Sequence, residues 1–408
     1  MPLAEVRALS LGTLEGDAET VTGVRVDSRL VEPGDLFVAV AGGEAWLDDA
    51  RGRGAAATLV PDDAFAALAA LGSAVRARSD ARIVAITGSV GKTSTKDILA
   101  ALVRPHRRTV EAPRGFNNEI GLPLTLCLIE PDTEVVVTEM AMRGPGQIRD
   151  LARIARPHVG VITAIAPVHL EQLGSLANIA RAKAELLDEL EPGSVAVLPE
   201  EAPELEPFVP DGLDVRRFGP PEAEVRDGRT HVRWHGRDVV FGFSARHQAA
   251  NAAAALTAAE ALGLKPPTAP VDVAFSLWRS QEVELPGGGL LVNDSWNANP
   301  VAMRAALAHL LERANGRRTV AVLGDMAELG PEAPRYHEEI GSVAEAIDVV
   351  VGVGELARGY APDAWVGTAA EAVDAVRELL RPGDAVLVKG SRSVGLEIVA
   401  DALLGTGA

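Results

Sequence analysis

Short runs of apolar residues alternate along this chain with longer segments in which apolar residues recur at helical spacing. The first 80 residues contain only brief strand-like runs, separated by turn signals such as Pro33-Gly34-Asp35. These runs span residues 24–26, 36–40 and 58–60. The pattern predicts a small domain of mixed strands and helices over residues 1–80.

A regular alternation of apolar strands and helical segments begins at residue 81. The strand-like runs span residues 83–86, 135–137, 159–162 and 195–198. Strands that alternate with helices in this way form a parallel sheet covered by helices. We therefore predict a central parallel-sheet domain over residues 81–270.

The alternation resumes after a proline-rich stretch at residues 265–270. The later runs span residues 290–292, 320–323, 349–353 and 386–388. They predict a Rossmann-like C-terminal domain over residues 271–408, with hinges near residues 80 and 270. Because 408 residues exceed what one hydrophobic core usually organises, an α/β protein of three domains is the expected architecture.

A glycine-rich loop follows the first strand of the central domain. The run at 83–86 leads directly into Thr87-Gly88-Ser89-Val90-Gly91-Lys92-Thr93-Ser94, and a helical segment comes next. Glycines let backbone N–H groups approach phosphate oxygens, and a helix N-terminus favours anions. Two residues separate Gly88 from Gly91, where the generic phosphate loop has four. A plain glycine turn is the alternative, but strand, Gly-Lys-Thr and helix together favour nucleotide binding.

Two polar residues come after neighbouring strands, where parallel sheets place their ligands. Glu139 follows the run at 135–137, and His169 follows the run at 159–165. Mg²⁺ takes oxygen ligands, usually one or two carboxylates with water and phosphate. Glu139 is therefore a candidate ligand on chemistry alone, whereas His169 is equally well explained as a hydrogen-bonded loop histidine.

A lysine interrupts the apolar stripe of the helical segment 176–190. Lys183 falls seven residues after Leu176 and four before Leu187, which places it on the buried face. One interpretation is that its side chain extends to the edge of the helix. The other is that burial depresses the amine pKa and makes the neutral amine available for chemistry.

The charge balance excludes some partners. The formal net charge is -18 and the sequence pI is about 4.9, so nothing attracts the whole chain to nucleic acid or an anionic membrane. No apolar run approaches the roughly 20 residues of a membrane span, and the first residues lack a signal-peptide core. The single cysteine, Cys127, forms no internal disulfide and lies in an apolar stretch. We expect a cytoplasmic protein.

Four further segments resemble, in chain order, motifs of the Mur ligase family. They are residues 115–123 (GFNNEIGLP), 293–300 (NDSWNANP), 324–330 (GDMAELG) and 389–393 (KGSRS). The shortened phosphate loop and the segments around His169 and Lys183 also resemble family elements. The resemblance spans nearly the whole chain. It implies ATP-dependent ligation of D-alanyl-D-alanine to UDP-N-acetylmuramoyl-tripeptide through an acyl phosphate, in peptidoglycan precursor synthesis.

The resemblance also implies roles for residues that bind ATP and metal. The nucleotide would lie between the central and C-terminal domains, along the loop from Thr87 to Ser94, with Asn251 at the adenine and Asp294 at the ribose. Mg²⁺ would be held by Thr93, Glu139 and His169, and carbamylated Lys183 would serve a second ion. Lys92, Glu139, His169 and Lys183 would form the catalytic group.

Substrate-binding roles are implied in the same way. Ser28 and Arg29 would help to bind the UDP-sugar end. The residues expected at the peptide substrates are Asn117, Asn118, Asn297, Asn299, Lys389, Ser391 and Arg392. Asn299 also precedes a proline at the start of a helical segment, so a helix-capping role is an alternative that is compatible with binding.

Other activities remain open at the level of sequence. Another Mur-type ligase, such as the diaminopimelate-adding enzyme or folylpolyglutamate synthase, shares the loop, although the segments at 293–300 and 389–393 argue against both. A phosphate-loop NTPase without ligase activity is a more distant alternative. The pattern does not indicate an obligate oligomer, so a monomer is expected, and the third residue of the peptide substrate stays open.

Overall fold

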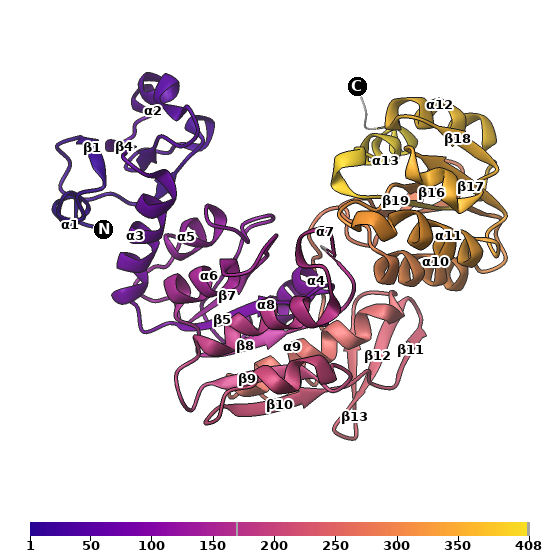
Figure 1. The fold of residues 1–408 in the computed structure, drawn as a ribbon, viewed down its shortest axis with the longest axis horizontal. Coiled ribbons are helices and arrows are strands. Elements are labelled where there is room, and N and C mark those ends of the chain that lie inside the picture. The colour runs from indigo at the N-terminus through magenta and orange to yellow at the C-terminus, as the bar shows by residue number, and fades with distance from the viewer. Residues whose placement is uncertain (169, 406–408) are drawn as a thin grey trace.

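The computed structural model describes residues 1–168 and 170–405, which form three bodies in chain order (Figure 1). The N-terminal part, in indigo, and the C-terminal part, in yellow, stand at opposite ends of the view, each next to the central part. Every strand-like run predicted from the sequence falls on an observed strand. The predicted α/β fold of three domains is confirmed.

The N-terminal part is built on a four-stranded sheet in the order β1-β4-β3-β2, in which only β1 and β4 are antiparallel. Its core joins Leu36 and Leu59 of the sheet to Leu68 and Leu71 of helix α3. The elements are α1 (Leu3–Ala8), β1 (Gly12–Glu15), β2 (Val24–Arg25), β3 (Leu36–Val38), α2 (Leu47–Gly52), β4 (Ala57–Pro61) and α3 (Ala64–Ala77).

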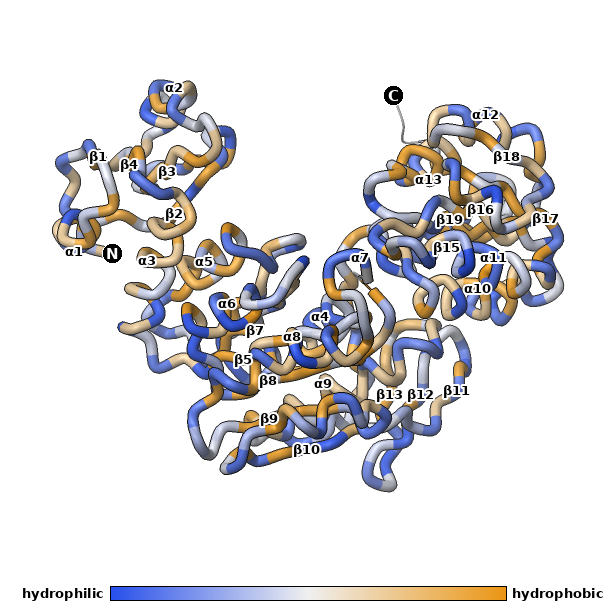
Figure 2. The backbone as a smooth tube through the Cα atoms, in the orientation of Figure 1, coloured by the Kyte–Doolittle hydropathy of each residue, from blue (hydrophilic) through white to orange (hydrophobic). Residues whose placement is uncertain are grey.

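The central part carries a six-stranded, fully parallel sheet in the order β10-β9-β8-β5-β7-β6. Strands β5 and β7 are buried along almost their whole length, as continuous apolar runs predict. Hydrophobic stretches, in orange, run along strands of the central sheet (Figure 2). The elements are β5 (Arg82–Thr87), α4 (Lys92–Val103), β6 (Thr109–Glu111), α5 (Gly121–Leu126), β7 (Val135–Glu139), α6 (Gln147–Ala155), β8 (Val159–Ile162), α7 (Leu170–Leu173), α8 (Leu176–Asp188), β9 (Val195–Pro199), β10 (Asp214–Phe218) and α9 (Ala249–Ala261).

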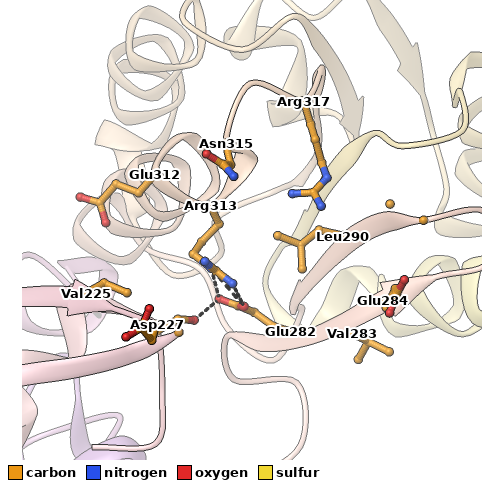
Figure 3. Close-up of a pocket in the computed structure, with 14 residues that line it drawn as sticks. Val225, Asp227, Glu282, Val283, Glu284, Leu290, Glu312, Arg313, Asn315 and Arg317 are labelled. Atoms are coloured by element: carbon orange, nitrogen blue, oxygen red, sulfur yellow. Dashed lines mark hydrogen bonds and ion pairs between the residues drawn. The ribbon is translucent and has the colours of Figure 1, made fainter. Parts of the chain in front are cut away.

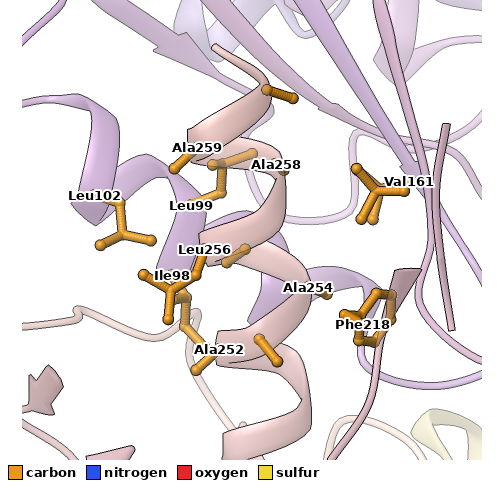
Figure 4. Close-up of a cluster of buried hydrophobic side chains, with 14 of the residues drawn as sticks. Ile98, Leu99, Leu102, Val161, Phe218, Ala252, Ala254, Leu256, Ala258 and Ala259 are labelled. Carbon is orange, nitrogen blue, oxygen red and sulfur yellow. The ribbon is translucent and has the colours of Figure 1, made fainter. Parts of the chain in front are cut away.

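Helices α4 and α9 pack together in the largest hydrophobic core of the central part. Ile98, Leu99 and Leu102 of α4 meet the alanine-rich helix α9, with Phe218 of β10 on its other side (Figure 4). Helices α6 and α8 belong to a second core with the sheet. Helix α4 is therefore fixed on the sheet, and its first residue lies at the end of the glycine loop.

A three-stranded antiparallel sheet, which the sequence pattern did not reveal, extends the central part. It consists of β11 (Ala223–Arg226), β12 (Arg229–Trp234) and β13 (Arg237–Phe241). Only alternate residues of β12 are buried, and its exposed positions are charged or polar. Such short strands lack the continuous apolar run that marks the parallel sheet.

The C-terminal part has a six-stranded sheet in the order β14-β15-β19-β16-β17-β18. All neighbours are parallel except the edge strand β14, which pairs antiparallel with β15. The sheet is therefore mixed. The elements are β14 (Gln281–Leu285), β15 (Gly289–Asp294), α10 (Pro300–Ala314), β16 (Thr319–Gly324), α11 (Ala333–Ala344), β17 (Val349–Val353), β18 (Ala364–Val366), α12 (Ala369–Leu379), β19 (Ala385–Lys389) and α13 (Glu397–Leu404). No helix among the described residues is long and apolar enough to cross a bilayer.

Candidate active site

The glycine loop joins the end of β5 to the start of α4. Gly88 has φ +146° and Gly91 has φ +84°, both in the region that side chains other than glycine's rarely adopt. A Cβ at Gly88 would lie 2.0 Å from the Thr163 hydroxyl oxygen, and one at Gly91 would lie 2.1 Å from Asn251 Oδ1. The loop therefore needs glycine at both positions.

Hydrogen bonds to the segment after β8 hold the backbone of this loop. The Ser89 N–H donates to the Ala164 carbonyl at 2.8 Å, and the Ser89 hydroxyl bonds both backbone groups of Ala166 at 3.0 Å. Thr163 donates to the Val90 carbonyl at 2.6 Å. The residue that precedes α4 is Gly91, which has no side chain to cap the helix, so the first N–H groups of α4 are available to an anion.

Lys92 folds back over the loop. Its amine donates to the Gly88 carbonyl at 2.7 Å. Burial lowers the pKa of Lys92, Glu139 opposes that shift, and Arg279 adds to it. The neighbouring Thr87 hydroxyl is fully buried and donates to the Met140 carbonyl at 2.8 Å, so it stabilises the loop from below.

Glu139, the last residue of β7, is held by two side chains. The Thr93 hydroxyl donates to its Oε2 at 2.9 Å, and the Asn117 amide donates to its Oε1 at 2.8 Å. Thr93 and Glu139 thus bring two hard oxygen donors together at the start of α4, and this donor set fits Mg²⁺ bound to a nucleotide. His169, the other metal ligand expected from the sequence, lies outside the described residues.

Lys183 lies on the buried face of α8, as its spacing predicts, with 1% of its surface exposed. Burial, with a further contribution from Lys92, lowers the pKa of Lys183 well below its ordinary value. No carboxylate counters this shift among the described residues. The neutral amine is therefore favoured.

A cavity between the central and C-terminal parts brings the loop next to residues that are distant in sequence, as far along the chain as Lys389. Asp294, at the end of β15, accepts hydrogen bonds from Lys389 at 2.5 Å and from the Ser280 N–H at 3.1 Å. Lys389 also donates to the Asn297 carbonyl at 2.9 Å. The site residues expected from the sequence that line this cavity are Ser89, Val90, Gly91, Lys92, Thr93, Ser94, Asn251, Asp294, Asn297, Asn299 and Lys389.

Two asparagines of the cavity also have structural partners. Asn251 donates to Gln248 Oε1 at 2.6 Å, which fixes its side chain against Gly91. The Asn299 side chain accepts the Ala302 N–H at 2.9 Å and caps α10, which confirms the capping interpretation. Capping leaves the second lone pair and the amide of Asn299 for other partners.

Several other candidates lie outside the cavity lining. Asn118 accepts the Gly121 N–H at 2.9 Å and thereby supports the start of α5, while the Ser391 hydroxyl accepts the Ala327 N–H at 2.9 Å. Arg392 pairs with Glu397. In the N-terminal part, Arg29 pairs with Asp27 at 2.6 Å and is 81% exposed, whereas Ser28 is buried.

Arg279 is a cavity residue that the sequence interpretation left out of the site. It belongs to the segment between α9 and β14, and its guanidinium donates to the Thr93 hydroxyl at 3.3 Å. His247 lines the same cavity, and its buried Nδ1 has no hydrogen-bond partner within the described part of the chain. Neither residue stands in a strong sequence pattern, since the fold alone brings them to the loop.

The central and C-terminal parts also meet at a second cavity, away from the loop (Figure 3). There Arg313 of α10 donates two hydrogen bonds to the carboxylate of Glu282 of β14, from Nε to Oε1 at 3.0 Å and from Nη2 to Oε2 at 2.9 Å. Ser244, from the central part, donates to the same carboxylate. Burial would raise the pKa of Glu282, but the His309 ring nitrogen 2.9 Å away and hydrogen bonds from Arg313 and Ser244 lower it to about 2. Glu282 therefore ties the two parts together as a carboxylate.

Comparison with known proteins identifies relatives over the whole chain. The Mur ligase middle domain matches residues 86–259, and the Mur ligase, glutamate ligase domain matches residues 278–392. The UDP-N-acetylmuramoyl-tripeptide--D-alanyl-D-alanine ligase of Mycobacterium leprae is 33% identical, covering 97% of this chain and 95% of that protein.

Solved structures agree with this. MurF from Acinetobacter baumannii superposes with a TM-score of 0.85 at 26% identity, covering 99% of this chain and 98% of the other. MurF from Thermotoga maritima in complex with ADP gives a TM-score of 0.81 at 27% identity, covering 95% and 98%. The chain belongs to the Mur ligase family, in the branch of the UDP-N-acetylmuramoyl-tripeptide--D-alanyl-D-alanine ligases.

Proposed function

We propose that this protein is an ATP-dependent ligase that joins D-alanyl-D-alanine to UDP-N-acetylmuramoyl-tripeptide, with release of ADP and phosphate, in peptidoglycan precursor synthesis. The observation that carries the proposal is the cavity in which the phosphate loop of the central part faces Asp294 and Lys389 of the C-terminal part. The activity named for relatives that match the chain from end to end supports this choice of substrates.

ATP binds across that cavity in this proposal. The N–H groups of the loop from Thr87 to Ser94 and the Lys92 amine hold the phosphates, as the free N-terminus of α4 favours. Asn251 lies against the loop and contacts the adenine. Asp294 binds the ribose, and its hydrogen bond from Lys389 orients it for that role.

Thr93 and Glu139 would hold Mg²⁺, and His169 is proposed as a further ligand. When bound, the metal would supply positive charge to the phosphoryl oxygens. Lys183 is proposed to be carbamylated, because a buried neutral amine reacts with carbon dioxide more readily than an ammonium group. The carbamate would place a negative charge near Lys92 and relieve the repulsion between the two amines.

The remaining candidates are assigned to the two substrates. Ser28 and Arg29 contact the UDP-sugar end from the N-terminal domain, residues 1–80. The peptide ends are bound by Asn117, Asn118, Asn297, Asn299, Lys389, Ser391 and Arg392. Asn297 and Lys389 are the best placed of these, since both line the cavity.

The reaction proceeds in two steps. The peptide carboxylate attacks the γ-phosphorus of ATP, which forms an acyl phosphate and ADP, while Lys92 and Arg279 neutralise charge on the phosphoryl oxygens. The dipeptide amine then attacks the activated carbonyl, a tetrahedral intermediate forms, and phosphate leaves. Domain closure between residues 81–270 and 271–408 brings the groups together. We propose a cytoplasmic monomer.

ADP release with varied acceptors tests the proposal. The purified protein is supplied with ATP, Mg²⁺ and UDP-N-acetylmuramoyl-tripeptide, and then with D-alanyl-D-alanine, diaminopimelate or L-glutamate. Of these three amine substrates, we expect only D-alanyl-D-alanine to support ADP release. Turnover that is equally fast without the UDP-peptide would identify an NTPase, and turnover with glutamate or diaminopimelate would identify another ligase of the family.

A further inference from the structure

An arginine of the central part rests on two tryptophans that belong to the other side of the domain boundary. Arg114 lies in the loop between β6 and α5, and its guanidinium carbon is 4.0 Å from the ring centroids of both Trp278 and Trp296. Trp278 belongs to the segment that links the two parts, and Trp296 follows β15. The two rings, 5.9 Å apart and inclined by 36°, form an angled aromatic surface. Arg392 also lies over it, 4.9 Å from the Trp278 ring and 5.7 Å from the Trp296 ring, so Arg114 is the nearer of two cations.

The rings are the partners that hold Arg114. Among the described residues its guanidinium has no hydrogen bond or ion pair. Burial lowers its pKa, Arg392 and Arg279 lower it further, and Glu397 opposes that shift in part. A cation over two indole rings is attracted by both, and such a contact changes an equilibrium constant roughly 2- to 30-fold.

The backbone of the linking segment is held in an unusual conformation at this contact. Trp278 has φ +64° and Ser280 has φ +47°, which a bulky residue such as tryptophan rarely adopts. The Trp296 N–H donates to the Trp278 carbonyl at 3.3 Å. Conformations of this kind persist where the surrounding contacts fix them. The position of Trp278 is therefore determined by its partners.

The same loop and the same linking segment meet again at the phosphate site. Asn117, three residues after Arg114, donates to Glu139, and Glu139 accepts from Thr93. Thr93 in turn accepts from Arg279, the residue next to Trp278. The contacts form a closed ring, from the tryptophan surface through the loop to the carboxylate and back through the linking segment.

Helix α4 anchors both parts of this ring. Lys96 and Asp97 form a buried ion pair, 2.8 Å between nitrogen and oxygen, with 3% of each side chain exposed. Lys96 donates to the Ala112 carbonyl at 3.1 Å, at the start of the loop. Asp97 accepts the Ser276 N–H at 2.8 Å, two residues before Trp278 in the linking segment. Helix α4, which begins at the phosphate loop, thus fixes the distance between the loop that carries Arg114 and the linking segment that carries Trp278.

We infer that Arg114 is a positioning residue for the ligation reaction: through Trp278 and Trp296 it couples the seating of the C-terminal domain to the loop that orients Glu139. The inference rests on the proposed function, because Glu139 is assigned there to the nucleotide-bound metal. When the C-terminal domain seats on Arg114, Asn117 is held in place and Glu139 with it. Because such coupling is reciprocal, Mg²⁺ and nucleotide favour the seated domain.

Binding of ADP with and without Mg²⁺ tests this coupling without any need for turnover. Calorimetry is carried out on the wild type, Arg114→Met, Arg114→Lys and the control Arg104→Met, which removes an exposed arginine of the same domain that pairs with Glu111. We expect the Mg²⁺-dependent gain in ADP affinity to fall about 10-fold in Arg114→Met, with metal-free binding unchanged. Arg114→Lys should retain part of the gain, and Arg104→Met all of it.

Kinetics supply the second readout. The kcat/KM for D-alanyl-D-alanine should fall by a similar factor in Arg114→Met and in Trp296→Leu, and the double variant should be no worse than either single one. An unchanged Mg²⁺-dependent gain in Arg114→Met, or additive losses in the double variant, would overturn the inference. If the wild type fails to ligate the dipeptide, the proposed function fails, while the ADP measurements still decide the role of Arg114.

Discussion

Gly91→Ala perturbs the phosphate loop at a position where a neighbouring side chain leaves no room. Gly91 has φ +84°, and an added Cβ would lie 2.1 Å from Asn251 Oδ1. Gly263 offers a matched control in the same domain, because it has φ +83° but no atom within 4 Å of an added Cβ. Both substitutions introduce the same backbone strain, and only one introduces the overlap.

The expected magnitudes differ accordingly. An L-residue held at a left-handed backbone position costs about 1–2 kcal/mol, which is the whole expected effect of Gly263→Ala. At Gly91 the Asn251 side chain must also move and give up its 2.6 Å hydrogen bond to Gln248, which adds about 1 kcal/mol. The total free-energy cost of Gly91→Ala is about 2–3 kcal/mol. Both the phosphate loop and the Asn251 side chain are disturbed by it.

Calorimetric titration with ADP and Mg²⁺ separates the two variants. Since about 1.4 kcal/mol is a tenfold change in affinity, we expect Gly91→Ala to bind ADP at least about 10-fold more weakly. Gly263→Ala should bind it as the wild type does, with a lower melting temperature only. Equal ADP affinity in both variants would refute the argument that the loop and Asn251 form one packed nucleotide site.

Three further predictions address the site and its supports. Lys183→Met should abolish ligation yet unfold no more easily at pH 7. The pKa of the free Lys183 amine is lowered in the fold, so wild-type stability in bicarbonate-free buffer, where the amine is unmodified, should rise with pH toward the ordinary value of 10.5. Thermal unfolding of Lys183→Met should lack that rise. Glu282→Gln should lower stability by about 1–2 kcal/mol at pH 7, a value reduced for the partial exposure of the pair. Because the pKa of Glu282 is lowered from 4.5 to about 2, this difference should shrink as the pH falls from about 4.5 to 2, as melting curves at pH 7 and pH 3 will show. Asn299→Ala removes the cap of α10 and should cost about 1 kcal/mol, measured by denaturant unfolding, with a separate loss of dipeptide affinity if its amide binds substrate.

Local patterns in the sequence predicted the parts of the site that depend on neighbouring residues. The strand, glycine loop and helix from 83 to 103 are set by an apolar run, by glycines that need positive φ, and by a helical stripe. The burial of Lys183 follows from its spacing within one helix. The cap made by Asn299 follows from the proline after it. Each of these signals is contained in one short continuous stretch of the chain.

Contacts between distant segments were beyond that kind of prediction. Arg279 and Arg114 lie 165 positions apart, and nothing near either residue marks it as a neighbour of the phosphate loop or the tryptophans. The antiparallel sheet β11–β13 was not predicted from the sequence, because its strands are short and the exposed positions of β12 are polar. Asn118 and Ser391 hydrogen-bond the backbone in the structure, and their roles in substrate binding remain predictions.

The most direct test of the central claim is the mass of the product formed from ATP, Mg²⁺, UDP-N-acetylmuramoyl-tripeptide and D-alanyl-D-alanine. The proposed ligase should yield a UDP-linked pentapeptide and one ADP per peptide bond, and neither should form when the dipeptide or the UDP-peptide is omitted. ADP that accumulates without a product of higher mass, or at the same rate without either substrate, would contradict it.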